Sequence, residues 1–138
     1  MRRRTRAREL ALKLLYKLDL LGEEPTKENV SCLAAEVREP SIVEFATDLV
    51  TNCCKHRKDL DRVIAGVVRN WDIRRMAIID RNIMRIAVYE LLYRQDIPEK
   101  VAINEAIDLA KKYSTADSGA FVNGILDKIR EGKHAQKG

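Results

Sequence analysis

Five arginines within the first eight residues are the side chains most able to do chemistry in this 138-residue sequence. A guanidinium group is always charged and presents a planar fork of donors that matches phosphate oxygens. A cluster of such groups at one end of a chain predicts binding to RNA or DNA. The alternative interpretation is a solvated basic terminus without a ligand. The five are Arg2, Arg3, Arg4, Arg6 and Arg8.

The residues that follow the arginines must position them, and their apolar side chains have the spacing of a helix. They recur every three or four residues, as on the buried face of an amphipathic helix. The predicted face consists of Leu10, Ala11, Leu14, Leu15, Leu18 and Leu21. We therefore expect a basic arm over residues 1–8, carried by a helix that is anchored in the core.

Charge is distributed unevenly along the chain. The 26 basic and 21 acidic side chains give a net charge of +5. Residues 1–22 hold seven basic and two acidic side chains, whereas residues 23–54 hold two basic and seven acidic ones. A basic end attracts a polyanion, and an acidic segment suits either water or a basic partner.

Helical spacing continues through the whole sequence, and no segment has the alternating pattern of a strand. We expect a single all-α domain over residues 1–138, with about seven helices and short connections. Ser41, followed by Glu44, is expected to cap the third helix, and Trp71 to continue the apolar stripe of the fourth. The basic residues 132–138 are predicted to form a mobile tail after a last helix that ends near Arg130.

Several protein classes are excluded by what the sequence lacks. No apolar run approaches the roughly 18 residues that a membrane span needs. Cys32, Cys53 and Cys54 do not form a disulfide framework, which indicates the cytoplasm. Cys53 is predicted to lie in the core, because no second ligand pair has zinc spacing. Without a glycine-rich phosphate loop or a serine nucleophile elbow, we predict no enzyme, no cofactor and no metal.

Four segments resemble the NusB family of bacterial transcription antitermination factors. Residues 6–16 are similar to that family's arginine-rich opening helix, and residues 80–91 to its central pattern. Residues 101–106, VAINEA, and 121–128, FVNGILDK, resemble its C-terminal signature. Their order, spacing and total length match, whereas residues 23–75 match only loosely.

The resemblance implies a fold of two small helical bundles packed across each other. It implies binding of boxA, a single-stranded RNA element of ribosomal RNA leaders, jointly with a small ribosomal protein in the NusE role. The complex would load onto RNA polymerase and suppress premature termination. Family members occur as monomers and as homodimers, and the sequence leaves both states open.

The resemblance also suggests site residues beyond the five arginines. Phe121 is a candidate to stack on a base, or else an ordinary core residue. Asp117, beside Ser118, could accept a hydrogen bond from a base or merely cap its helix. Position suggests Tyr16, Asp80 and Glu90 as contacts for the basic ribosomal protein. The alternatives are a core aromatic for Tyr16 and a helix cap for Asp80.

Two other functions compete with this hypothesis. One is a NusB-like RNA-binding domain of the kind fused to RNA cytosine methyltransferases. That hypothesis places a long catalytic segment after the helices, which we do not expect because the chain stops at Gly138. The other is a helical protein–protein scaffold with incidental arginines. A scaffold should have no phosphate-dependent affinity for RNA, so a salt titration separates it from an RNA-binding protein.

Overall fold

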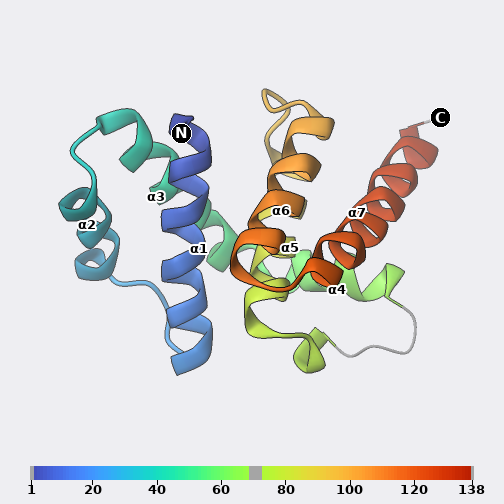
Figure 1. The fold of residues 1–138 in the computed structure, drawn as a ribbon, viewed down its shortest axis with the longest axis horizontal. Coiled ribbons are helices and arrows are strands. Elements are labelled where there is room, and N and C mark those ends of the chain that lie inside the picture. Colours follow the sequence, from blue (N-terminus) through green and yellow to red (C-terminus); the bar gives the residue numbers. More distant parts are fainter. Residues whose placement is uncertain (1, 69–72, 138) are drawn as a thin grey trace.

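The computed structural model describes residues 2–68 and 73–137. It contains no strand in these residues, so the predicted all-α fold is confirmed. None of its helices has both the length and the apolar character needed to cross a bilayer. The elements are α1 (Arg3–Leu21), α2 (Lys27–Glu36), α3 (Pro40–Lys55), α4 (Arg57–Val67), the 3-10 helix η1 (Ile73–Arg75), α5 (Ile78–Tyr93), α6 (Glu99–Tyr113) and α7 (Ala116–Lys137) (Figure 1).

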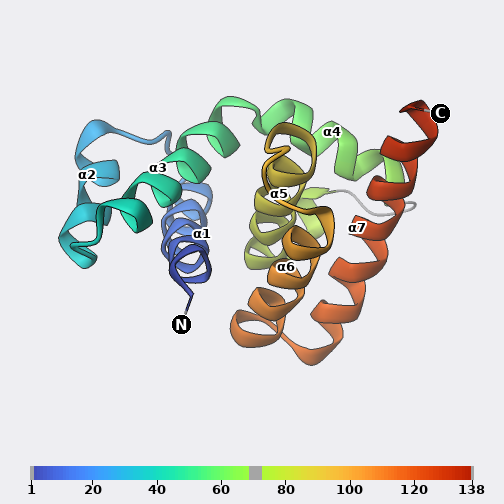
Figure 2. The same cartoon turned by 90° about the horizontal axis from the view of Figure 1, so that it is seen from above.

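The helices form two groups, as the family resemblance implies. Helices α1, α2 and α3 lie on one side of the molecule, and α4, α5, α6 and α7 on the other (Figures 1 and 2). Helix α5 is central, because it packs against α1, α3, α4, α6 and α7 and is buried over most of its length. Helix α1 contacts both α3 and α5, so it lies where the two groups meet.

Helix α1 is buried on more than the one side that its apolar spacing predicts. Leu10, Ala11, Leu15 and Leu18 are buried as expected, but Leu21 is 55% exposed. The helix also buries Ala7, Arg8, Glu9 and Leu12. This second buried side faces α5 and α6, because Arg8 bonds to Glu90 on α5 and Glu9 bonds to Lys112 on α6. Charged residues near the start of α1 therefore lie in the interior.

Turn chemistry explains where α1 ends and where α2 and α3 begin. Gly22 ends α1 in the left-handed conformation with a φ of 67°, which glycine adopts without steric cost. Thr26 and Asn29 form a capping box at the start of α2. The predicted Ser41 cap is wrong, because α3 already begins at Pro40. Proline suits the first helical position, where its missing N–H would have no partner in the helix.

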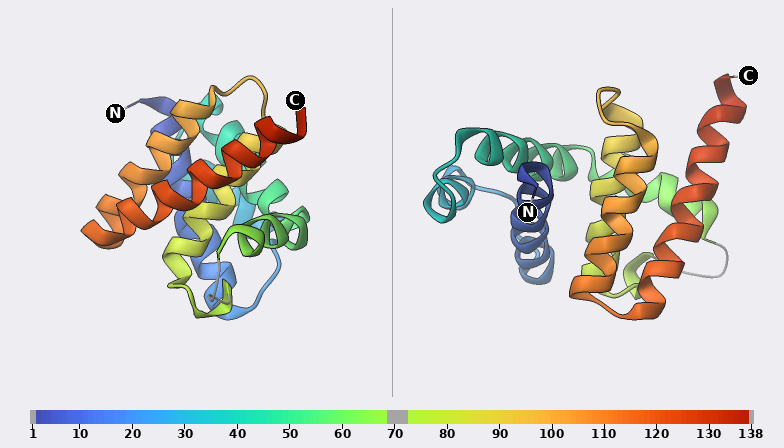
Figure 3. Two further views of the ribbon diagram at one scale, coloured as in Figure 1. Left: turned by 90° about the vertical axis from the view of Figure 1, so that its right-hand side faces the viewer. Right: turned by 45° about the horizontal axis from the view of Figure 1, so that its top comes forward.

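The last helix is longer than predicted. Helix α7 continues through residues 132–137, where we expected a mobile tail, and it packs along α6 (Figure 3). Lys133 donates to the Leu91 carbonyl at 2.8 Å and lies 3.2 Å from a Glu99 oxygen. His134 contacts the same carboxylate at 2.7 Å. These contacts to α5 and α6 hold the final turns. The predictions for Trp71 and for Gly138 lie outside the described residues.

Candidate nucleic-acid interface

The start of α1 presents arginines to solvent on a rigid element. Arg2, Arg3 and Arg4 are exposed, and Arg6 is partly exposed. Arg3 lies 3.1 Å from Glu39, in a pair whose side chains are 69% and 43% exposed. Arg4 and Asp96 lie further apart, at 3.6 Å, and their side chains are 51% and 52% exposed. Exposed pairs of this kind contribute little energy, so an incoming phosphate can replace the carboxylates.

Arg8 does not belong to this surface. Its side chain is 2% exposed and makes a two-pronged contact with Glu90, which is 1% exposed. Nε donates to Oε2 at 2.8 Å, and Nη2 donates to Oε1 at 2.6 Å. The predictions that Arg8 contacts RNA and that Glu90 contacts a protein partner are therefore wrong, because neither side chain reaches the surface.

The Arg8–Glu90 pair instead joins α1 to α5 across the contact between the two helical groups. Burial raises the pKa of Glu90, Arg8 acts against that effect, and the balance leaves the pKa above its ordinary value. Arg8 also lies 3.6 Å from Glu105 on α6, whose carboxylate accepts the Thr5 hydroxyl at 2.8 Å. Parallel N–H···O bonds strengthen such a pair and so offset part of its desolvation.

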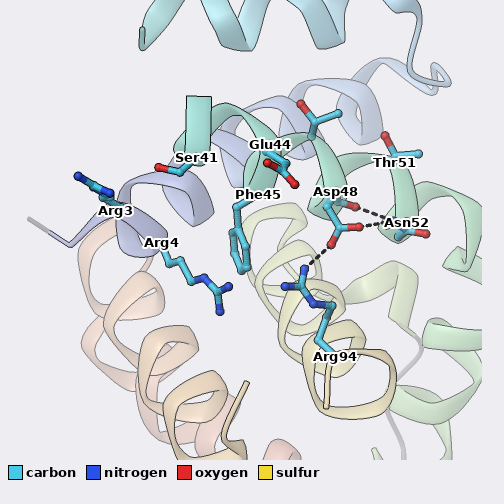
Figure 4. A pocket seen from close by; sticks show the side chains of 10 residues that line it. Arg3, Arg4, Ser41, Glu44, Phe45, Asp48, Thr51, Asn52 and Arg94 are labelled. Atoms are coloured by element: carbon cyan, nitrogen blue, oxygen red, sulfur yellow. Dashed lines mark hydrogen bonds and ion pairs between the residues drawn. The ribbon is translucent and has the colours of Figure 1, made fainter. Parts of the chain in front are cut away.

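A cleft of about 790 Å³ lies beside the exposed arginines, between the start of α1, one face of α3 and the end of α5 (Figure 4). Phe45, which is buried, lines the cleft, and three guanidinium groups lie against its ring. Their central carbons lie 4.7 Å (Arg4), 5.3 Å (Arg8) and 5.1 Å (Arg94) from the ring centroid. Cation–π contacts of this kind hold Arg4 at the edge of the cleft.

Carboxylates of α3 and of the segment after α5 fix Arg94 within the same cleft. Arg94 donates to Asp48 at 2.7 Å and to both oxygens of Asp96 at 2.9 Å. The Arg94 bond lowers the pKa of Asp96 to about 2. Helix α3 adds a polar face of hydroxyl and carboxylate groups at helical spacing. This face comprises Ser41, Glu44, Asp48 and Thr51. The cleft therefore combines hydrogen-bonding groups with guanidinium groups that are already paired with carboxylates.

Sequence reasoning did not find this cleft. Phe45 was not singled out, and Arg94 lies outside the arginine cluster at the chain's start. The two residues meet only because α3 packs against α5. No local pattern signals a contact between residues so far apart in sequence.

The start of α7 holds the second predicted group of RNA residues. Thr115 accepts from the backbone N–H of Ser118 at 3.2 Å, so Thr115 caps the helix and Asp117 is left exposed. The Ser118 hydroxyl is buried and donates to Asp80 at 3.1 Å, which connects α7 to α5. Phe121 is partly buried and packs against the core.

The predicted partner residues are placed differently from one another. Tyr16 is 38% exposed and shares a face of α1 with Leu20, which is 55% exposed and four residues further on. Asp80 is 8% exposed, and Ala77 rather than Asp80 occupies the cap position of α5. The apolar pair on α1 is thus more accessible than either predicted acidic residue.

Asp19, next to this apolar pair, is occupied by internal contacts. Its carboxylate accepts from Nε and Nη2 of Arg81, both at 2.7 Å, and from the Asn82 amide at 2.8 Å. Burial alone would raise the pKa of Asp19, but these bonds and the Arg85 charge lower it to about 2. The carboxylate therefore stays ionised at neutral pH and joins α1 to α5.

Cys53 lies in the core, as predicted, with 1% of its surface exposed. Burial raises the pKa of its thiol. Residues 2–68 and 73–137 contain no cluster of three or more His, Cys, Asp or Glu side chains able to hold a metal ion.

The chain was compared with known proteins and solved structures. A family model described as the NusB family matches residues 5–131. The transcription antitermination protein NusB of Symbiobacterium thermophilum is 43% identical, with 98% of this chain and 94% of that protein aligned. The protein of the same name from an Anaeromyxobacter species is 49% identical, over 94% and 91%.

Solved structures share the fold. A structure of T. maritima NusB has a TM-score of 0.86 and 34% identity, and the match covers 95% of this chain and 92% of that one. A structure described as antitermination factors NusB and NusE in complex with dsRNA contains a chain with a TM-score of 0.84 and 32% identity. That match covers 96% of this chain and 98% of the other.

Proposed function

The chain belongs to the NusB family, and from this premise we propose that it is a transcription antitermination factor that binds boxA-type single-stranded RNA. It would act in the cytoplasm with a small ribosomal protein in the NusE role. The joint complex would load onto RNA polymerase and prevent premature termination in ribosomal RNA leaders. The observation that carries the proposal is the group of exposed arginines on the first turns of α1.

The proposal assigns phosphate contacts and base contacts to two different parts of the surface. The arginines supply affinity through phosphate contacts, which do not depend on sequence. The start of α7 supplies base contacts, with Phe121 as the stacking residue and Asp117 as an acceptor. Ser118 positions this turn through its bond to Asp80. The proposed RNA residues are Arg2, Arg3, Arg4, Arg6, Asp117, Ser118 and Phe121.

Fluorescence anisotropy with labelled RNA tests the function. We expect a boxA-like strand to bind more tightly than a scrambled strand, and the partner ribosomal protein to widen this difference. The logarithm of the association constant should fall linearly with the logarithm of salt concentration. With three exposed arginines and the partly exposed Arg6 we expect a slope of about −3, because each phosphate contact on a single strand contributes about −0.7.

Two other outcomes of this titration would point elsewhere. If neither the RNA sequence nor the partner changes the affinity, the arginines are a generic basic end. If RNA binding is absent at low salt, the scaffold function is the better description, and a protein ligand should be sought.

The apolar pair on α1 gives a prediction for the protein partner. Replacing Leu20 with serine should weaken binding of the ribosomal protein about tenfold, because a central apolar contact at an interface contributes more than 1 kcal/mol. Binding of RNA by the chain alone should not change. Isothermal titration calorimetry measures the effect. Val101→Ser on α6 is the control, because Val101 is also an exposed aliphatic residue, at 38%. Equal affinities for both variants would exclude this face as the contact.

A further inference from the structure

A buried carboxylate holds two cations side by side at the surface between α1 and α6. Glu9 is only 3% exposed, and Lys112 Nζ lies 2.6 Å from its Oε2 atom. Arg6 Nη1 lies 3.8 Å from its Oε1 atom. Lys112 is 50% exposed and Arg6 34%, so both cations reach solvent while the carboxylate lies beneath them. The arrangement joins residues 103 positions apart in sequence.

This cluster carries one positive charge in excess, and its Lys112 ammonium group is hydrogen-bonded to the buried carboxylate. Since both nitrogens contact one carboxylate, their separation is below the Debye length of about 10 Å at 0.1 M ionic strength. An anion in front of them therefore interacts with both charges at once. The bond to Glu9 raises the pKa of Lys112, a shift in the direction that favours the charged ammonium form. Side chains held in place before binding lose less conformational entropy when a ligand arrives.

The position of the cluster links the two parts of the proposed RNA surface. Arg6 follows directly on the exposed arginines of α1. Lys112 lies in the last turn of α6, just before the turn that leads into α7 with Asp117 and Phe121 (Figure 1). A strand that passes from the α1 arginines to the start of α7 can cross the surface at this cluster.

We propose that Arg6 and Lys112, positioned by Glu9, form a phosphate site that carries one RNA strand from the first helical group to the second. This inference rests on the proposed function, because it requires that the chain bind single-stranded RNA. It adds Lys112 as a direct phosphate contact and Glu9 as a positioning residue. One strand then engages α1, α6 and α7 together.

Removing the charge of Lys112 tests the site. The substitution Lys112→Gln keeps a donor for Glu9, so we expect it to fold as the wild type does. It should lower RNA affinity about fivefold at 0.1 M salt and make the salt slope shallower by about 0.7, the contribution of one phosphate contact. Lys112→Arg keeps the positive charge, so its RNA affinity and salt slope should match those of the wild type. Lys100→Gln, in the first turn of the same helix, removes the same charge away from the cluster and should change neither.

A scan of the RNA backbone locates the contact. In each RNA of the series, one phosphate is replaced by a neutral methylphosphonate. With the wild-type chain, we expect neutralisation of one linkage near the middle of the strand to weaken RNA binding, because that linkage no longer attracts Arg6 and Lys112. With Lys112→Gln, neutralising that linkage should have no further effect, since the interaction is already absent.

The results separate this inference from the proposed function. If the wild-type chain binds no RNA, the function itself is wrong and the phosphate site with it. If the wild type binds and Arg4→Ala weakens binding, but Lys112→Gln behaves as Lys100→Gln does, only the phosphate site is wrong. The phosphate site is also wrong if every neutral linkage lowers RNA affinity equally, both for the wild type and for Lys112→Gln.

Discussion

Replacing Arg8 with alanine should lower the free energy of unfolding by about 3–5 kcal/mol, because it leaves a buried carboxyl group without its cationic partner. Glu90 is 1% exposed, and it loses the two bonds that Arg8 donates. The substitution also removes the contact to Glu105 and the guanidinium over Phe45. Since the pair joins α1 to α5, its loss weakens the contact between the two helical groups.

Urea denaturation followed by circular dichroism measures this loss. Arg4→Ala is the matched control, because Arg4 lies over the same Phe45 ring but is 51% exposed. Arg4→Ala should lower the free energy of unfolding by less than about 1 kcal/mol, because exposed ion pairs contribute little. The double variant Arg8→Met/Glu90→Met should recover much of the stability, since apolar replacement of a buried pair is often neutral. A single variant that is as stable as the wild type would mean that the pair does not hold the groups together.

The triple variant Arg3→Ala/Arg4→Ala/Arg6→Ala should bind RNA about 100-fold more weakly at 0.1 M salt. Each lost phosphate contact changes the salt slope by about 0.7, so the three together make it shallower by about 2. Because the electrostatic term scales with the logarithm of salt concentration, the difference from wild type should nearly vanish at about 1 M salt. Anisotropy titrations over a salt series measure both values.

A charge-matched control decides whether position or net charge is responsible. Lys58→Ala/Arg62→Ala/Lys128→Ala removes three exposed cations from α4 and α7. It should leave the slope close to the wild-type value. Both triple variants should unfold at nearly the same denaturant concentration as wild type. The ion pairs of Arg3, Arg4 and Arg62 are exposed and contribute little. Glu9, which loses Arg6, keeps its bond to Lys112. An equal loss of RNA affinity in both would show that only the net charge of the protein matters.

Local chemistry explains what could be predicted. Glycine at the end of α1 and a Thr–Asn pair at the start of α2 act on their own neighbours, so sequence alone locates those boundaries. The extension of α7 could not be predicted in this way. It depends on Lys133 and His134 contacting Glu99 and α5, and no periodic pattern encodes such contacts.

Residue types and their spacing are enough to establish the helical class, the likeness to a family and the presence of a cationic cluster at the start of α1. Which arginines of the cluster can meet a ligand depends on how the helices pack. Arg6 and Arg8 are the same residue type two positions apart, and each residue turns the helix by about 100°, so they point in different directions. Arg8 meets Glu90, 82 positions away, in the interior, whereas Arg6 reaches solvent beside Lys112. Periodicity identifies an apolar face, but the burial of a charge depends on a partner that only the packed chain brings to it.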